Sequence, residues 1–168
     1  MELRGCDDFD VMEYDIAQVC PNGHVANSTT IETPEFSDDF CEECGEATMT
    51  ACPSCGKPIR GTPLFGVTFG SYTPPAFCRY CGEAFPWTSG RLKAAREVAS
   101  EADQLSEEER KELANTLDDL VRDTPGTHVS AGRFKRLVAK AGVGTANALR
   151  DILVDIASET AKKVLWPT

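Results

Sequence analysis

Residues 41–56, CEECGEATMTACPSCG, contain two Cys-x-x-Cys-Gly motifs separated by the seven residues 45–51. Four thiolates at this spacing can form one tetrahedral metal site in a short hairpin, or each pair can belong to a different site. Which of these two arrangements is present decides the architecture of the first half of the chain. The other cysteines, and the histidine near them, distinguish the two.

Two further ligand pairs flank this stretch. Cys20 and His24 lie four residues apart in CPNGH, and Cys78 and Cys81 form a third Cys-x-x-Cys-Gly motif. The glycine after each Cys-x-x-Cys allows the chain to turn so that backbone amides point at thiolate sulfur. The four pairs together supply eight ligands, which is enough for two tetrahedral sites.

Three pairings of these motifs are possible. A single site within 41–56 would leave the first pair to join the last across more than fifty residues (25–77), and a RING-type interleaved pairing usually has a shorter connection between its middle pairs. Sequential pairing closes the sites over sixteen (25–40) and twenty-two (56–77) residues, near the usual spacing of paired knuckles. The spacing favours this pairing, with two zinc ions per chain held by Cys20, His24, Cys41 and Cys44 (site 1) and by Cys52, Cys55, Cys78 and Cys81 (site 2).

Composition divides the chain into two parts. Residues 1–90 contain four basic and fourteen acidic side chains and all eight cysteines, whereas residues 91–168 contain thirteen side chains of each sign. We therefore expect a double zinc-ribbon domain over 1–88 and a helical domain or oligomerisation arm over 89–168. The fold class that follows is α+β, with two tandem zinc ribbons of small antiparallel strands and about four helices.

The compartment follows from the termini and the thiols. No apolar run reaches the roughly 20 residues that span a bilayer, and the N-terminal sequence MELRGCDDFD is acidic, unlike a signal peptide. A cytoplasmic location is expected, where paired cysteines are metal ligands rather than disulfides. Cys6 is expected to be a free thiol and His128 a loop residue.

The helical part shows a period of three to four residues. Ser106 and Glu109 form a capping box for a second helix, after a first helix that reaches about Leu105. A third helix is expected after Ser130, with Val129 and Phe134 spaced as a hydrophobic staple. A single last helix is expected to bury the apolar stripe Leu149, Ile152, Leu153, Ile156, Ala157, Thr160 and Val164.

Three runs carry a family resemblance: QVCPNGHV (18–25), FCEECGEATMTACPSCGKPIRG (40–61) and PPAFCRYCGEAFPW (74–87). Together they resemble an uncharacterised family of bacterial double zinc-ribbon proteins, a conserved domain of unknown function. The resemblance covers roughly residues 14–95. It implies two zinc ribbons with the same two ligand sets, and it implies no known activity.

The expected function is non-enzymatic, because both sites have four protein ligands and no motif supplies a nucleophile or a general base. The leading hypothesis is a platform for a protein partner, basic in character, with a helical tail that forms homo-oligomers or docks an effector. Nucleic-acid binding is the second hypothesis, and a ubiquitin-ligase-like adaptor is the third, if the sites interleave. Candidate partner-binding residues are Arg60, Arg79, Tyr80, Phe85, Trp87, Arg133, Arg136 and Lys140.

Overall fold

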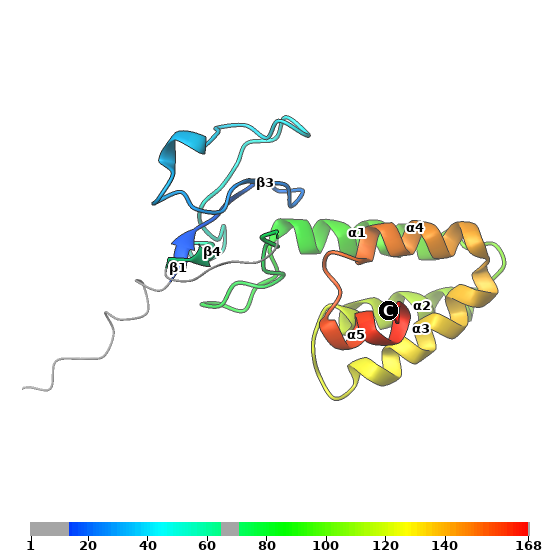
Figure 1. The fold of residues 1–168 in the computed structure, drawn as a ribbon. Helices are drawn as coiled ribbons and strands as arrows, with labels where there is room; N and C mark the ends of the chain where they lie inside the picture. Colours follow the sequence, from blue (N-terminus) through cyan, green and yellow to red (C-terminus); the bar gives the residue numbers. More distant parts are fainter. Residues whose placement is uncertain (1–13, 65–70, 168) are drawn as a thin grey trace, which may run out of the picture. The chain divides into compact units, whose positions relative to one another are not determined.

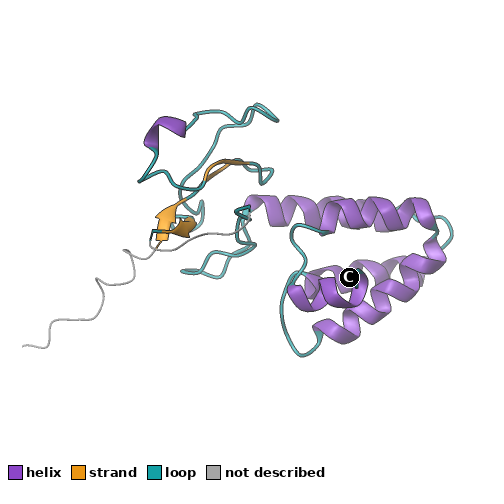
Figure 2. Cartoon of the chain, in the orientation of Figure 1, coloured by secondary structure: helices purple, strands orange, loops and turns teal. Residues whose placement is uncertain are grey.

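The computed structural model describes residues 14–64 and 71–167, so Cys6 lies outside the described residues. The chain divides into two compact units, Met1–Trp87 and Thr88–Thr168, here called the ribbon unit and the helical unit (Figure 1). Small antiparallel strands occupy the first and helices the second (Figure 2). The α+β class expected from the sequence is confirmed, with five helices instead of about four.

Two short antiparallel pairs form the sheet structure of the ribbon unit. Strand β1 (Tyr14–Ile16) pairs with β4 (Arg60–Pro63), and β2 (Gln18–Val19) pairs with β3 (Val25–Asn27). The connector between the two central Cys-x-x-Cys motifs is bonded on both sides, because Met49 exchanges backbone hydrogen bonds of 2.9 and 3.0 Å with Val19, and Thr50 accepts one of 2.8 Å from Ile59. The segment Thr48–Thr50 is thus a structural link rather than a metal-binding loop.

The stretch between His24 and Cys41 contains one strand, β3, and continues as a loop with a short helical turn. After β3, the Asn27 side chain accepts from the Thr29 N–H (2.8 Å) and donates to the Thr33 carbonyl (2.7 Å). A short 3₁₀ helix, η1 (Pro34–Phe36), follows. These hydrogen bonds to the Asn27 side chain take the place of the backbone pairing of a second strand, because Asn and Thr side chains compete with strand pairing for backbone N–H and carbonyl groups.

The core of the ribbon unit is small and includes metal-ligand candidates. Seven buried residues form it, with Met49 and Tyr72 packed against them, and two of the seven are cysteines: Ala17, Val19, Cys52, Ile59, Cys78, Phe85 and Trp87. The Phe85 and Trp87 rings stack with centroids 4.5 Å apart. The Trp87 indole N–H donates to the Pro75 carbonyl (3.0 Å). So few apolar side chains form too small a core for a stable fold without further constraint.

Gly61 in β4 allows a close backbone approach, and its substitution is expected to destabilise the ribbon unit. A Cβ at this position would overlap the Ser28 carbonyl oxygen and lie 2.8 Å from the Asp15 carbonyl group. Gly61→Ala is expected to cost about 1–3 kcal/mol of unfolding free energy, the usual range for overpacking. Gly90→Ala is the matched control, since nothing lies within 4 Å of that Cβ. Chemical denaturation measures both variants, and equal stability of the two would contradict this packing.

The helical unit contains five helices in chain order: α1 (Pro86–Ser100, which begins in the ribbon unit), α2 (Glu107–Leu120), α3 (Thr127–Ala141), α4 (Val143–Leu153) and α5 (Glu159–Leu165). Helix α3 packs against α2, α4 and α5. Leu113, Leu117, Leu120, Leu149 and Leu153 are fully buried. No helix among the described residues is long and apolar enough to cross a membrane.

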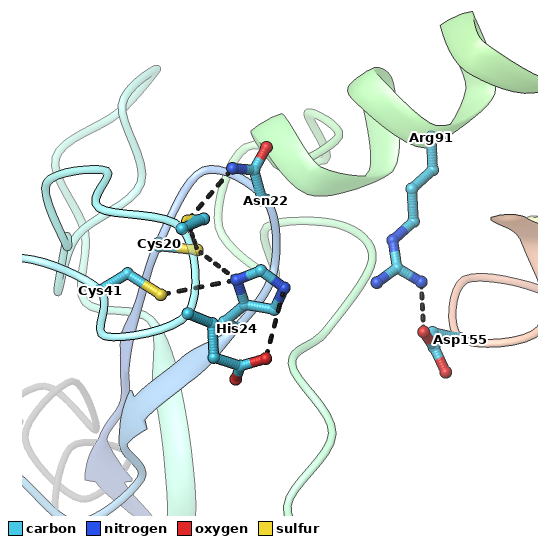
Figure 3. Close-up of polar contacts among 8 residues, drawn as sticks. Cys20, Asn22, His24, Cys41, Arg91 and Asp155 are labelled. Carbon is cyan, nitrogen blue, oxygen red and sulfur yellow. Dashed lines mark hydrogen bonds and ion pairs between the residues drawn. The ribbon is translucent and has the colours of Figure 1, made fainter.

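Polar contacts fix the start of α2 and connect α1 to α2 and to the turn between α4 and α5. The expected capping box is present: the Ser106 hydroxyl accepts from the Glu109 N–H (3.2 Å), and the Glu109 carboxylate accepts from the Ser106 N–H (3.0 Å). Arg96 on α1 donates to both oxygens of Asp118 on α2 (2.6 and 2.7 Å). Arg91 forms an ion pair with Asp155 in the turn between α4 and α5 (Figure 3).

Two boundaries differ from the sequence expectation. The third helix begins at Thr127, not after Ser130, because the Thr127 hydroxyl donates to the Arg122 carbonyl and accepts from the Thr124 N–H. His128 therefore lies in the helix rather than in a loop, contrary to expectation. Val129 also lies inside the helix with 55% of its surface exposed, so the staple with Phe134 is wrong. The last helix is two helices, since Ser158 caps α5 by accepting from the Ala161 N–H.

Glu109 also gives the helical unit a pH-dependent contribution. Hydrogen bonds from Lys140 and from the Ser106 N–H lower the pKa of this carboxyl below its ordinary value. Since the folded pKa is the lower one, the contribution is present above the unfolded pKa and is lost as pH falls through the folded pKa. Glu109→Gln keeps the cap acceptor and removes the charge. It is expected to be less stable than the wild type at pH 7 and equal below both pKa values in pH-dependent denaturation. A stability difference that is the same at both pH values would contradict this contribution.

Candidate metal centres

The structure brings the eight ligand candidates together as two clusters of four. Cys20, His24, Cys41 and Cys44 form one, Cys52, Cys55, Cys78 and Cys81 form the other, and within each the ligand atoms lie within 4.8 Å of one another. The clusters join the first pair with the second and the third with the fourth. In each cysteine pair the first thiol is buried and the second exposed, and Cys20 is buried as well.

The distances inside the clusters match a tetrahedral ion. Ligands at about 2.3 Å for sulfur and 2.0–2.1 Å for nitrogen place two sulfurs about 3.8 Å apart and sulfur and nitrogen about 3.5 Å apart. In site 1 the His24 Nδ1 is 3.5 Å from the sulfurs of both Cys20 and Cys41. In site 2 the sulfur pairs Cys52–Cys81 and Cys55–Cys78 are 3.9 and 3.7 Å apart. Each cluster can therefore hold one metal ion without rearrangement of its ligand atoms.

The three Cys-x-x-Cys-Gly motifs share one backbone geometry. The N–H of each first cysteine donates to the carbonyl five residues on, and the glycine N–H donates back to the cysteine carbonyl, all at 2.8 Å. The residues before and after each turn form isolated bridges, Phe40 with Ala47, Ala51 with Pro58, and Phe77 with Ala84. Gly45, Gly56 and Gly82 have φ between 71° and 76°. This left-handed conformation explains why glycine follows each motif.

The first pair forms a related turn that contacts the core. Gly23 has a φ of +92°, and a Cβ there would lie 3.0 Å from the Cβ of Trp87. The Cys20 N–H donates to the His24 carbonyl (3.0 Å), which places both side chains on one side of the turn. The packed indole thus lies directly behind the turn that presents Cys20 and His24.

Two polar residues support site 1 from outside the ligand set (Figure 3). The Asn22 side-chain amide donates to the Cys44 sulfur (3.3 Å). The Glu43 carboxylate lies 3.8 Å from the His24 Nε2, the ring nitrogen that points away from the sulfurs. A carboxylate on that side favours the tautomer with hydrogen on Nε2, which leaves Nδ1 free to bind a metal.

The thiol pKa values show why these clusters suit a cation. The Asn22 amide and the Glu46 N–H lower the pKa of Cys44 to about 6. Burial opposes ionisation of Cys78, but the N–H groups of Cys81 and Tyr80 bring its pKa to about 7. Although the Glu83 N–H favours the Cys81 thiolate, burial and the neighbouring sulfurs raise the pKa of Cys81 to about 12.

Four sulfurs this close cannot all be charged without a counter-ion, because like charges in contact disfavour ionisation. A divalent cation reverses this effect and deprotonates coordinating thiols. The backbone N–H groups and Asn22 already favour thiolate at particular positions. The clusters therefore have the donor set, spacing and electrostatics of tetrahedral metal sites.

The partner-binding candidates lie in different environments. Arg60, Arg79 and Tyr80 are exposed, with 48% of the Tyr80 surface accessible. Trp87 is 3% exposed and Phe85 is 2% exposed. Their assignment to a binding surface is corrected, because the small ribbon core uses both rings.

Of the three partner-binding candidates on α3, two form ion pairs within the helical unit. Lys140 pairs with Glu109 (2.7 Å) and Arg136 with Glu112 (3.5 Å), both on α2, while Arg133 is exposed. Two of the three charges thus connect α3 to α2.

Sequence reasoning did not identify Asn22, Glu43 or Tyr14 as functional candidates. Asn22 lies between the two ligands of the first pair, and an amide inside a ligand turn is a signal that could have identified it. Tyr14 contacts Arg60 across β1 and β4, with the guanidinium carbon 3.5 Å from the ring centroid. That contact depends on strand register, which a single sequence does not supply.

Comparison with known proteins places this fold and its two clusters in a family. A family model described as an uncharacterized protein conserved in bacteria (DUF2321) matches residues 13–165. No curated protein and no solved structure matches the chain. The match extends through both ligand clusters and nearly all of the helical unit. The chain therefore belongs to DUF2321, a bacterial family with two four-ligand clusters in this member.

Proposed function

We propose that this chain is a non-enzymatic zinc protein, in which two structural zinc ribbons form a rigid platform for a protein partner. The observation that carries the proposal is the pair of clusters with four protein ligands each, at the spacing of a tetrahedral ion. A four-ligand site leaves no position for water, whereas catalytic zinc sites keep one open. Metal binding supplies the folding free energy that the seven-residue core lacks.

Zinc fits both ligand sets. Three cysteines with one histidine, and four cysteines, are the usual structural zinc combinations, and zinc has no redox chemistry that would disturb a platform. The sites need reduced thiolates, which supports a cytoplasmic location.

The charge distribution supports a protein partner. Residues 14–50 contain eight acidic and no lysine or arginine side chains. An acidic surface steers a basic partner and repels nucleic acid. The helical unit, with its separate core, would form homo-oligomers or dock an effector.

Cobalt substitution tests the structural role of the metals. A cobalt-loaded chain with closed sites is expected to give the absorption spectrum of tetrahedral thiolate coordination, unchanged when imidazole is added. An open coordination position would bind imidazole and change the spectrum, and that result would contradict the non-enzymatic assignment.

Asn22→Ala is expected to weaken metal binding at site 1 alone. The Asn22 amide donates to the Cys44 sulfur (3.3 Å), and loss of such outer contacts typically costs about 10–100-fold in metal affinity. Competition with a chromophoric chelator measures both sites in one sample, so site 2 is the internal control. Equal weakening of the two sites would show that Asn22 acts on the whole unit instead.

Nucleic-acid binding is the second candidate, and Tyr80 favours it. Two cations contact its exposed ring, since the Lys57 Nζ and the Arg79 guanidinium carbon lie 5.9 and 5.5 Å from its centroid. Exposed tyrosines with flanking cations stack bases in single-strand binding proteins. Titration with labelled single strands tests this, and Arg79→Glu should abolish any such binding.

A further inference from the structure

A hollow on the ribbon unit gathers the cations of this unit. The hollow has a volume of ≈ 50 Å³, and Tyr14, Arg60, Arg79 and Tyr80 contribute to its lining. Lys57 lies beside it, because its Nζ is 5.9 Å from the centroid of the Tyr80 ring. Residues 14–87 contain no lysine or arginine other than these three. A strongly acidic unit therefore has all its described cations around one hollow.

Two of these cations interact with aromatic rings instead of carboxylates. The Arg60 guanidinium carbon lies 3.5 Å from the centroid of the Tyr14 ring. Within residues 14–64 and 71–167, neither Lys57 nor Arg60 forms an ion pair, whereas Arg91, Arg96 and Lys140 of the helical unit do. Cation–π contacts hold a guanidinium in place and leave its positive charge uncompensated.

The carboxylate that lines the hollow forms no ion pair with Lys57 or Arg60 and is occupied by backbone hydrogen bonds. Asp15 is 2% exposed, and its oxygens accept from the N–H groups of Ile16 (2.6 Å), Ile31 (2.8 Å) and Glu32 (3.1 Å). Its hydrogen bonds hold the loop after β3. The remaining lining is apolar, from Ile16, Ile31, Pro58 and Ile59, and Ile31 is 57% exposed. The hollow thus offers Arg60, with Lys57 close by, beside an exposed ring and exposed apolar surface, and neither cation has an ion pair among the described residues.

We infer that this hollow binds an acidic segment of a protein partner, with a carboxylate at Lys57 and Arg60 and an apolar side chain against Tyr80 and Ile31. The inference rests on the proposed platform function, and it assigns one short acidic segment to a partner whose surface is otherwise basic. The positive charges of Lys57 and Arg60 favour an acidic side chain in the bound segment, and the exposed Tyr80 and Ile31 favour an apolar side chain next to it.

Three cations and a small hollow suit a short peptide better than a nucleic acid. Nucleic-acid affinity grows with the number of phosphates that lysine and arginine neutralise along a track. Here there is no such track, because residues 14–50 contain eight acidic side chains and no lysine or arginine. A peptide with a few carboxylates meets less of this repulsion than a polyphosphate does.

The test uses the full metal-loaded chain and three fluorescent probes: the end-capped peptide Glu-Asp-Phe-Glu-Asp, its amide counterpart Gln-Asn-Phe-Gln-Asn, and a short oligothymidylate. We expect the acidic peptide alone to bind, with an affinity that falls as salt rises. Lys57→Gln/Arg60→Gln should weaken binding about tenfold, as loss of two surface ion pairs would. Tyr80→Ala should also weaken it.

The matched control is Lys93→Gln/Arg150→Gln, which removes the same charge from exposed positions of the helical unit and should bind like the wild type. Equal binding of the amide peptide, tighter binding of the oligothymidylate, or an equal loss in the control would overturn the inference. Metal content is measured in the same samples. If the wild type holds two ions per chain and does not bind the peptide, the peptide-binding role of the hollow is wrong and the proposed function is unaffected. If the wild type holds no metal, the proposed zinc-platform function is wrong as well.

Discussion

Cys78→Ser is expected to unfold the ribbon unit and to reduce the metal content from two ions per chain to one or none. Cys78 is both a site 2 ligand candidate and one of the seven buried core residues. Structural zinc sites contribute roughly 10–16 kcal/mol of apparent binding free energy, which exceeds what so small a core provides. Trp87 reports the loss, because its ring is 3% exposed and stacked on Phe85. In a Trp166→Phe background, its fluorescence should shift to that of a solvated indole.

Cys6→Ser is the matched control for this variant, since the same chemical change is made at a cysteine that is not one of the eight ligand candidates. It should retain both ions and the buried Trp87 signal. The helical unit has separate buried leucines, so far-UV circular dichroism of Cys78→Ser should retain most of the helical signal. A Cys78→Ser chain with two ions and native fluorescence would contradict the role given to site 2.

Leu117→Ala is expected to destabilise the helical unit by about 2–5 kcal/mol, the usual cost of truncating a fully buried leucine. Leu117 is 0% exposed on α2, which packs against α3. Urea denaturation followed by circular dichroism measures the loss. The metal content of the ribbon unit should remain unchanged, because the substitution touches neither cluster.

Asn115→Ala on the same helix is the comparison, since this side chain is exposed and alanine is the better helix former. It should be neutral or slightly stabilising. A loss below about 1 kcal/mol in Leu117→Ala would mean that the site collapses around the cavity or that α2 is not packed as described.

The ligand clusters were predictable because their determinants are local. A Cys-x-x-Cys-Gly motif forms its own turn. In each of the three copies the first cysteine and the glycine donate backbone hydrogen bonds within the turn, and the glycine has a positive φ. The Ser106 capping box was predictable for the same reason, since its partners lie three residues apart. The family resemblance stated from these motifs agrees with the family match over residues 13–165.

The remaining features depend on contacts between distant residues. The apolar stripe of the last helix continues through Ile156 and Ala157, so its periodicity hid the break that Ser158 and the Leu120 carbonyl define. Trp87 was expected at the surface because aromatic residues beside cations are typical of binding sites. Its burial follows from the shortage of other large apolar side chains in the ribbon unit, which only a complete list of the core reveals.

Elemental analysis of the native chain tests the central claim most directly. The account predicts two zinc ions per chain for the two clusters, with Cys41→Ser reducing the content to one while site 2 stays loaded. Cys41 and Cys52 lie in the short stretch shared between the sites, so the double variant Cys41→Ser/Cys52→Ser distinguishes the pairings. Sequential pairing predicts loss of both ions, whereas a single site within residues 41–56 predicts that one ion remains. One ion per chain in the wild type, loss of both ions on Cys41→Ser alone, or iron in place of zinc would contradict the account.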